Sequence, residues 1–175
     1  MRIASAQTKA DTAQVDSEIA GLIVRARGYD REAFASLYRL TVTPIYRYFS
    51  TRVNRSEDAE ELTQEVFLAA LDRIQSLRAD NETGLLAWLF QIARNKFADH
   101  LRQRYRKPVA PLQEAETAEA SQERPEDAAE TNEEQKELRQ ALQRLTPEQR
   151  DVIVCKYVLG YDNQRTARLV GKNIN

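Results

Sequence analysis

Apolar residues recur three and four positions apart through most of the N-terminal half of the chain, and this spacing predicts amphipathic helices. Asp16 or Ser17 is suited to cap the first of these helices, and Gly28 to end it. Pro44 lies inside the second apolar stripe and predicts a kink or a break there, and Ser56 is expected to cap the third helix. The four expected helices are residues 16–28, 30–53, 56–74 and 85–106.

The helical pattern stops at Pro108 and Pro111 and resumes near residue 132. Residues 108–131 carry almost no large apolar side chains, so they predict a flexible acidic linker that cannot bury a core. Beyond the linker, a helix is expected over residues 132–145, and Thr146 with Pro147 is a strong start for the next one. A further helix, capped by Asp162 and ended by Gly171, would complete the start of a helix-turn-helix unit.

The fold class that follows is all-α, with two small helical domains joined by the linker. The polar residues 1–15 lack periodicity and predict a loose tail, and residues 75–84 predict a loop. The first domain is expected over residues 16–107 and the second over residues 132–175. No run of alternating β-branched residues is long enough to predict a sheet.

Charge is distributed unevenly, although the formal net charge is only −1. Residues 88–107 hold six Lys or Arg against one acid, Asp99, whereas residues 108–134 hold nine acids against one base, Arg124. The helix dipole explains some cations at a helix C-terminus, but six exceed that need. This asymmetry is typical of interaction surfaces, and the basic helix end suits contacts with phosphates.

The titratable residues exclude several classes of protein. Cys155 is the single cysteine, so no disulfide can form within the chain and no Cys-based metal site can either; it is expected to be a buried apolar residue, with a redox role as the minor alternative. His100 is the single histidine, and it has no ligand partners at metal spacing. We therefore expect no enzyme active site, metal, cofactor or small-molecule substrate. Without a signal-peptide core or an apolar run of about 18 residues, a cytoplasmic protein without membrane contact is expected.

Two segments of the first domain resemble region 2 of the extracytoplasmic-function (group IV) sigma factors. One is the run from Asp58 to Leu68 (DAEELTQEVFL), and the other is the run from Trp88 to Asn95 (WLFQIARN), followed by Asp99. Residues 145–150 (LTPEQR) resemble the start of region 4 in the same family. The resemblance implies a factor that binds core RNA polymerase, directs it to promoters and helps to open them, without covalent chemistry.

In this family the third helix of region 2 binds the coiled coil of the polymerase β′ subunit. An acidic face around an apolar residue suits docking onto an arginine-rich helix, although such a face is often only solvated, and Phe67 could equally be core. The residues that take this role by resemblance are Asp58, Glu61, Leu62, Gln64, Glu65 and Phe67.

The resemblance assigns the −10 promoter element to the fourth helix and the loop before it. There a base of the non-template strand leaves the stack and enters a protein pocket, which needs a basic groove and a small polar pocket. Asn95 could pair with a base edge or tie the loop to the helix, and Trp88 is expected in the core. The residues implied for −10 DNA are Ala79, Asp80, Asn81, Glu82, Thr83, Gly84, Arg94, Asn95, Lys96, Arg102, Arg104 and Arg106.

Region 4 departs from the family pattern. Thr166 and Lys172 stand where apolar residues are usual, and the recognition helix for the −35 element would begin near Ile174, at the end of this sequence. Backbone contacts near −35 are implied for Arg150 and Arg165. The expected partners are core RNA polymerase through the β′ coiled coil and the β flap, promoter DNA and an anti-sigma protein. The alternative is a helical adaptor or decoy that binds polymerase or an anti-sigma protein without reading −35 DNA.

Overall fold

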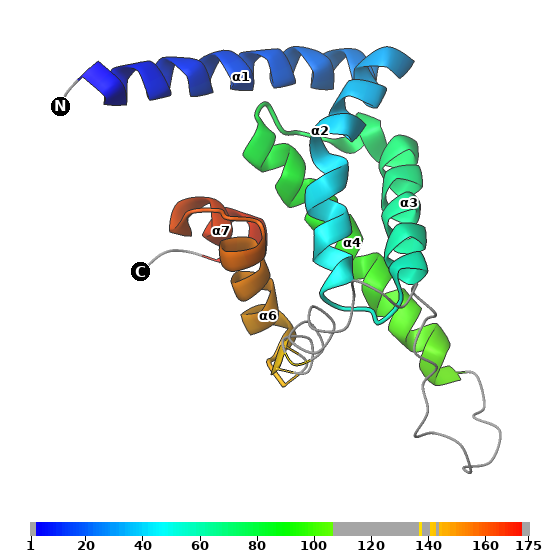
Figure 1. Cartoon of the computed structure of the whole chain (residues 1–175). Helices are drawn as coiled ribbons and strands as arrows, with labels where there is room; N and C mark the ends of the chain where they lie inside the picture. Colours follow the sequence, from blue (N-terminus) through cyan, green and yellow to red (C-terminus); the bar gives the residue numbers. More distant parts are fainter. Residues whose placement is uncertain (1–2, 107–136, 138–140, 143, 173–175) are drawn as a thin grey trace, which may run out of the picture.

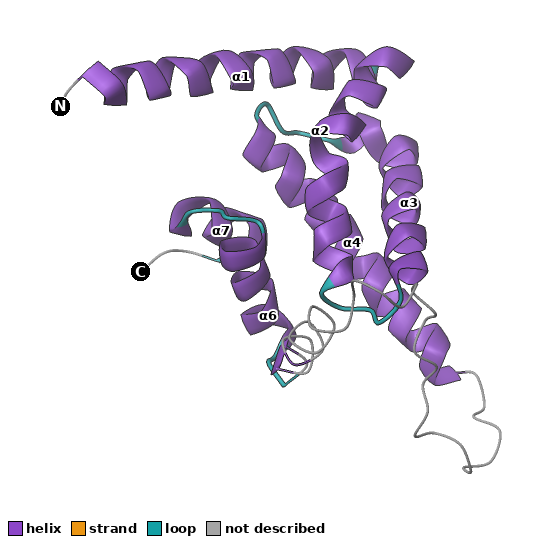
Figure 2. Ribbon diagram, in the orientation of Figure 1, coloured by secondary structure: helices purple, strands orange, loops and turns teal. Residues whose placement is uncertain are grey.

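The computed structural model describes residues 3–106, 137, 141–142 and 144–172, and its described parts contain helices and no strand (Figures 1 and 2). They form a first unit, residues 3–106, and a second unit, residues 144–172. The predicted all-α fold is therefore confirmed. The predicted linker lies outside the described residues, as does most of the helix predicted over residues 132–145.

Helix α1 runs from Ile3 to Arg27 and extends well beyond the other helices of the first unit (Figure 1). The loose tail predicted over residues 1–15 is thus wrong from residue 3 onward. Ala-, Gln- and Lys-containing sequence has enough intrinsic helix propensity to extend a helix that is anchored at its other end. The anchor is the C-terminal part of α1, where Ile19, Ile23 and Ala26 are buried.

Helix α2 (Arg31–Ser50) begins at Asp30, whose carboxylate accepts a hydrogen bond of 3.1 Å from the backbone N–H of Ala33. This bond is the first cause of the lowered pKa of Asp30, and the nearby Arg25 guanidinium adds to it. Pro44 lies within α2 without splitting it into two helices. Buried residues on both sides of Pro44, among them Thr41 and Ile45, hold the helix together through packing.

Helix α3 spans Ser56–Arg73 and is followed by a short 3₁₀ segment, η1 (Ile74–Ser76). The predicted cap at Ser56 is wrong by one position, because Arg55 occupies the N-cap and its side chain makes no capping bond. Glu57 lies in the first turn of α3, where its negative charge complements the helix dipole.

Helix α4 spans Glu82–Arg106, so it begins three residues earlier than the sequence predicted. The side chain of Asn81 causes this early start, because its Oδ1 accepts a hydrogen bond of 2.8 Å from the N–H of Gly84. The predicted loop is therefore shorter, and its last three residues form the first turn of α4.

The core of the first unit lies where α2, α3 and α4 pack against one another (Figure 1). Tyr48 contacts the rings of Phe49 and Phe90 edge-on, with 5.3 Å between centroids in each pair. Trp88 is half-buried and packs against this core, as predicted. Such edge-to-face contacts add to the hydrophobic stabilisation of the buried rings.

The second unit contains α6 (Pro147–Ile153), a π-helical segment η2 (Val154–Val158) and α7 (Asn163–Val170). Its predicted caps are confirmed. Thr146 forms a capping box with Gln149, Asp162 caps α7, and Gly171 ends α7 at a φ of 69°, a conformation that suits glycine.

The two units pack against each other, chiefly through contacts between α7 and α4. Val154, Cys155 and Leu169 of the second unit belong to the same buried cluster as the core of the first. No helix in the described part of the chain is long and apolar enough to span a membrane.

Candidate functional site

The acidic face of α3 separates into exposed and buried positions. Glu61 and Gln64 are exposed, and Asp58 and Glu65 are partly exposed. Leu62 and Phe67 are only 2% and 7% exposed, so both side chains pack in the hydrophobic core. Phe67 packs edge-on against Tyr38 with 4.7 Å between ring centroids. The side chains of this face that a partner can contact are therefore the carboxylates of Asp58, Glu61 and Glu65 and the amide of Gln64.

A polar groove of about 580 Å³ lies between α3 and the C-terminal half of α4. The ammonium of Lys96 lies 3.1 Å from the Glu65 carboxylate and joins the two helices. The groove thus places residues predicted for polymerase beside residues predicted for DNA. Its walls are Glu61, Leu62, Glu65, Lys96, Asp99, His100, Arg102, Gln103 and Arg104.

The outer side of α4 presents polar groups to solvent. Asn95 is exposed, and its Oδ1 accepts a long hydrogen bond of 3.4 Å from Gln91. Arg102 pairs with Asp99 at 2.6 Å, and Arg104 is exposed. The side chain of Arg106 lies outside the described residues. Among the described residues, no hydrogen bond joins the Asn95 side chain to the loop before α4.

The loop before α4 is held against the helix start. A Cβ atom on Gly84 would lie 2.9 Å from the Cβ of Ala79, closer than real Cβ contacts, so a side chain there would force the loop or the helix start to shift. The N–H of Glu82 donates to Asp16 of α1 at 3.3 Å, and the Glu82 carboxylate lies 2.6 Å from Arg165 of α7. The predicted −10 loop is therefore tied both to α1 and to the second unit.

Asp151 is a buried acid whose two cationic partners belong to the first unit. Its carboxylate pairs with Arg52, whose side chain is only 2% exposed, and lies 3.6 Å from Arg94. The Arg52 guanidinium stacks 3.6 Å above the Tyr48 ring and also donates to the Tyr48 carbonyl. Sequence reasoning missed Asp151 and Arg52, because no local pattern pairs residues 99 positions apart.

Groups around this cluster titrate abnormally because they are buried. Burial is the first cause of the raised pKa of Tyr48, which reaches about 12, and of Cys155, which reaches about 11. The negative charge of Asp151 raises the Cys155 pKa further, and the positive charge of Arg52 opposes that effect. Cys155 is thus a buried residue, as predicted.

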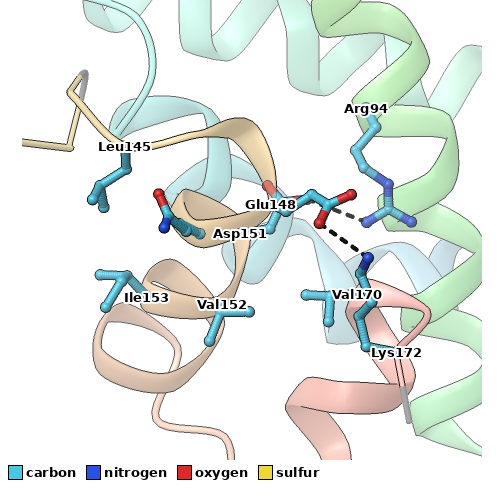
Figure 3. Close-up of a pocket in the computed structure, with 9 residues that line it drawn as sticks. Arg94, Leu145, Glu148, Asp151, Val152, Ile153, Val170 and Lys172 are labelled. Carbon is cyan, nitrogen blue, oxygen red and sulfur yellow. Dashed lines mark ion pairs between the residues drawn. The ribbon is translucent and has the colours of Figure 1, made fainter.

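A cavity of about 640 Å³ opens beside Asp151, between the second unit and α4 (Figure 3). Its apolar wall includes Val152, Ile153 and Val170, whereas Arg94 of α4 reaches in from the other side. Lys172 and Glu148 form an ion pair of 3.0 Å across one edge. Within the described residues no cluster of metal-binding side chains is present.

The described residues form a protein of two packed helical units, and two family models identify its class as sigma-70. The family model of sigma-70 region 2 matches residues 37–107, and the model of sigma-70 region 4 matches residues 135–175. A solved structure of CnrH in complex with the cytosolic domain of CnrY has a similar fold, with a TM-score of 0.63 at 20% identity over 88% of this chain and 83% of that one.

Curated relatives identify a narrower family within the sigma-70 class. The chain is 35% identical over 153 residues to the ECF RNA polymerase sigma factor BldN of Streptomyces coelicolor, covering 87% of this chain and 57% of the relative. It is 31% identical to the ECF RNA polymerase sigma factor SigM of Mycobacterium tuberculosis, covering 81% of this chain and 68% of the relative. The chain belongs to the family of ECF RNA polymerase sigma factors, which direct transcription initiation.

Proposed function

We propose that this chain binds core RNA polymerase through the exposed acidic side of α3 and binds the −10 element through α4 and the loop before it. The groove between α3 and α4 is the observation that supports this proposal, because it lines up carboxylates and cations along one continuous surface. Polymerase bound at the carboxylates would therefore lie directly beside DNA bound at the cations.

On the DNA side, the exposed cations supply affinity and Asn95 supplies selectivity. Lys and Arg neutralise phosphates whatever the sequence, whereas an amide can accept from and donate to one base edge. Arg102 lies about two turns beyond Asn95 on the same face of α4, within reach of the backbone of a strand whose base meets Asn95. Arg104 lies about two and a half turns beyond Asn95 and adds positive charge on the opposite face. In the second unit, Arg150 and Arg165 are proposed to contact the backbone near −35.

The partners that we propose are core RNA polymerase, through the β′ coiled coil and the β flap, promoter DNA and an anti-sigma protein. The complex of CnrH with CnrY shows that a protein of this fold is held by another protein. We place this chain in the cytoplasm, where polymerase and promoters are found. It works by binding alone and is not proposed to be an enzyme.

The decisive experiment is permanganate footprinting of promoter fragments with the purified chain and core RNA polymerase. Reactive thymines near −10 that depend on the chain would show that it opens promoters. Tight polymerase binding without any promoter opening would contradict the proposed −10 role of α4 and would favour an adaptor.

A further inference from the structure

One side chain of α1 reaches the loop that the proposed function assigns to the −10 element. The Oδ1 atom of Asp16 accepts a hydrogen bond of 3.3 Å from the backbone N–H of Glu82, which is 66 positions away in the sequence. Figure 1 shows how α1 runs past the start of α4 and the loop before it. The family model of region 2 begins at residue 37, so α1 lies outside the residues that it matches.

Asp16 does not cap its own helix. The sequence predicted it as a possible N-cap, but α1 begins at Ile3, so Asp16 lies in the helix interior. Aspartate is a poor residue there, because its side chain favours caps and turns. It is partly buried and lies one turn before Ile19, which packs in the core of the first unit. The carboxylate of Asp16 therefore faces the first unit and acts at the start of another helix.

At the start of α4, this carboxylate meets a group that needs an acceptor. The first backbone N–H groups of a helix have no partner within the helix. The Asn81 side chain accepts from the N–H of Gly84 at 2.8 Å, and Asp16 accepts from the N–H of Glu82. A negative charge at this end also complements the helix dipole. The junction between the loop and α4 is thus held by two side chains from two different parts of the chain.

The elements that carry this bond are themselves anchored. Ile19 and Ile23 hold α1 in the core, and Leu77, at the start of the loop, is only 1% exposed. Helix α1 also contacts η1, which directly precedes Leu77. Asp16 belongs to the same unit as the loop, so its bond does not depend on the second unit. A loop fixed in this way is ordered before it binds, and such preorganisation lowers the entropy cost of binding.

We propose that Asp16 is a positioning residue for promoter recognition, which holds the start of α4 so that the −10 loop meets DNA in one conformation. This inference rests on the proposed function of that loop. Asp16 does not contact DNA in this proposal, because its effect passes to the loop through the backbone of Glu82. Selection of the −10 base then depends on α1, whereas the affinity for phosphates, which the exposed cations of α4 supply, does not.

The test compares three variants of the full chain with the parent. Asp16→Ala removes the acceptor, whereas Asp16→Asn keeps an oxygen that can accept from the N–H of Glu82. Glu18→Ala is the matched control, because it removes the same charge two residues away on α1. Glu18 is exposed, and its described hydrogen bond is to Gln14 of the same helix.

The first measurement is hydrogen–deuterium exchange by NMR at the backbone amides of Glu82 and Gly84. Asp16→Ala is expected to raise both exchange rates at least about fivefold over those of Glu18→Ala, as the loss of one hydrogen bond does. Exchange in the middle of α3, and the melting temperature by circular dichroism, should stay close to the parent values. Asp16→Asn is expected to restore most of the protection.

The second measurement is promoter opening by each variant with core RNA polymerase, read by permanganate footprinting. It uses a promoter that the parent chain opens and the same promoter with one −10 base pair changed. The ratio of opening between the two promoters should fall at least about fivefold in Asp16→Ala, because a loosened loop loses base selection and keeps its phosphate contacts. Asp16→Asn should recover most of this ratio, and Glu18→Ala should match the parent.

Equal exchange rates in Asp16→Ala and Glu18→Ala would overturn the proposal, because the bond would then not hold the loop. Faster exchange with an unchanged promoter ratio would overturn it as well, since the conformation of the loop would then not select bases. Faster exchange throughout the chain with a lower melting temperature would make Asp16 a residue of general stability and would also overturn it. A parent chain that opens no promoter would instead contradict the proposed function, and the exchange rates would still decide whether Asp16 holds the loop.

Discussion

A substitution of Asn95 is expected to affect promoter recognition with little effect on folding. The Asn95 side chain is exposed, and its described hydrogen bond to Gln91 is long and lies on the surface, so its removal costs the fold little. Asn95→Ala is expected to leave polymerase affinity and the melting temperature nearly unchanged. Promoter-specific transcription should fall about tenfold, the value of one good base contact. Parallel measurements of transcription in vitro and of polymerase affinity would check this, and an equal loss in both would make Asn95 structural.

Gly84 gives a second prediction, because its lack of a side chain lets the loop before α4 pack closely against the start of that helix. Gly84→Ala forces a Cβ to within 2.9 Å of Ala79, so it is expected to destabilise the chain by about 1–3 kcal/mol, as overpacking does. Denaturant unfolding would measure the change, and binding to −10 DNA should weaken with it.

Gly21 provides the matched control for that prediction. It lies within α1, and no atom is within 4 Å of a Cβ placed on it. Gly21→Ala is therefore expected to stabilise the chain by about 0.5–1 kcal/mol, the gain from alanine in a helix interior. If both variants shifted stability in the same direction, the crowding at Ala79 would not be the cause.

Among the elements, α3 carries the proposed polymerase contact. The double variant Asp58→Arg and Glu65→Arg should weaken binding to core polymerase by at least about tenfold, because buried or central charge reversals at an interface are costly. Glu60→Arg is the control, since Glu60 is exposed and points to the opposite face of the helix at 100° per residue. Equal effects of the double variant and the control would place the docking surface elsewhere.

The sequence predicted which segments are helical better than it predicted where each helix begins and ends. Apolar periodicity located the elements of the first unit, and Thr146, Asp162 and Gly171 marked ends that the structure confirms. The start of α4 was misplaced because Asn81 and Gly84 read as loop residues, although one hydrogen bond between them begins a helix. The length of α1 was missed because a helix with few apolar residues at one end shows no stripe.

For the molecule as a whole, the packing of region 4 on region 2 was beyond prediction from sequence. Leu169 and Cys155 have the apolar character of ordinary core residues, and nothing local shows that they join a cluster shared with region 2. Asp151 directly follows the run of residues 145–150, and no pattern in the sequence marks it for burial. The residues proposed for the polymerase and promoter contacts come from the resemblance, and the variants described above test them.

The packing of region 4 on region 2 leads to a prediction about alkaline pH. The pKa of Cys155 is raised from 9.0 to about 11, chiefly by burial, so the folded state favours the neutral thiol. The stability that this thiol contributes is present below pH 9 and is lost as the pH rises through 11. Tyr48, raised from 10.0 to about 12 by burial beside Arg52 and Asp151, adds a second loss at higher pH.

Because both groups lie around the Asp151 cluster, region 4 should separate from region 2 at alkaline pH before the helices melt. The radius of gyration from small-angle X-ray scattering should then rise at a lower pH than the loss of helical circular dichroism. Cys155→Ala removes the thiol and should move this separation to higher pH, toward the range in which Tyr48 ionises. An identical pH profile in Cys155→Ala and the parent chain would mean that ionisation of Cys155 does not control the contact between the units.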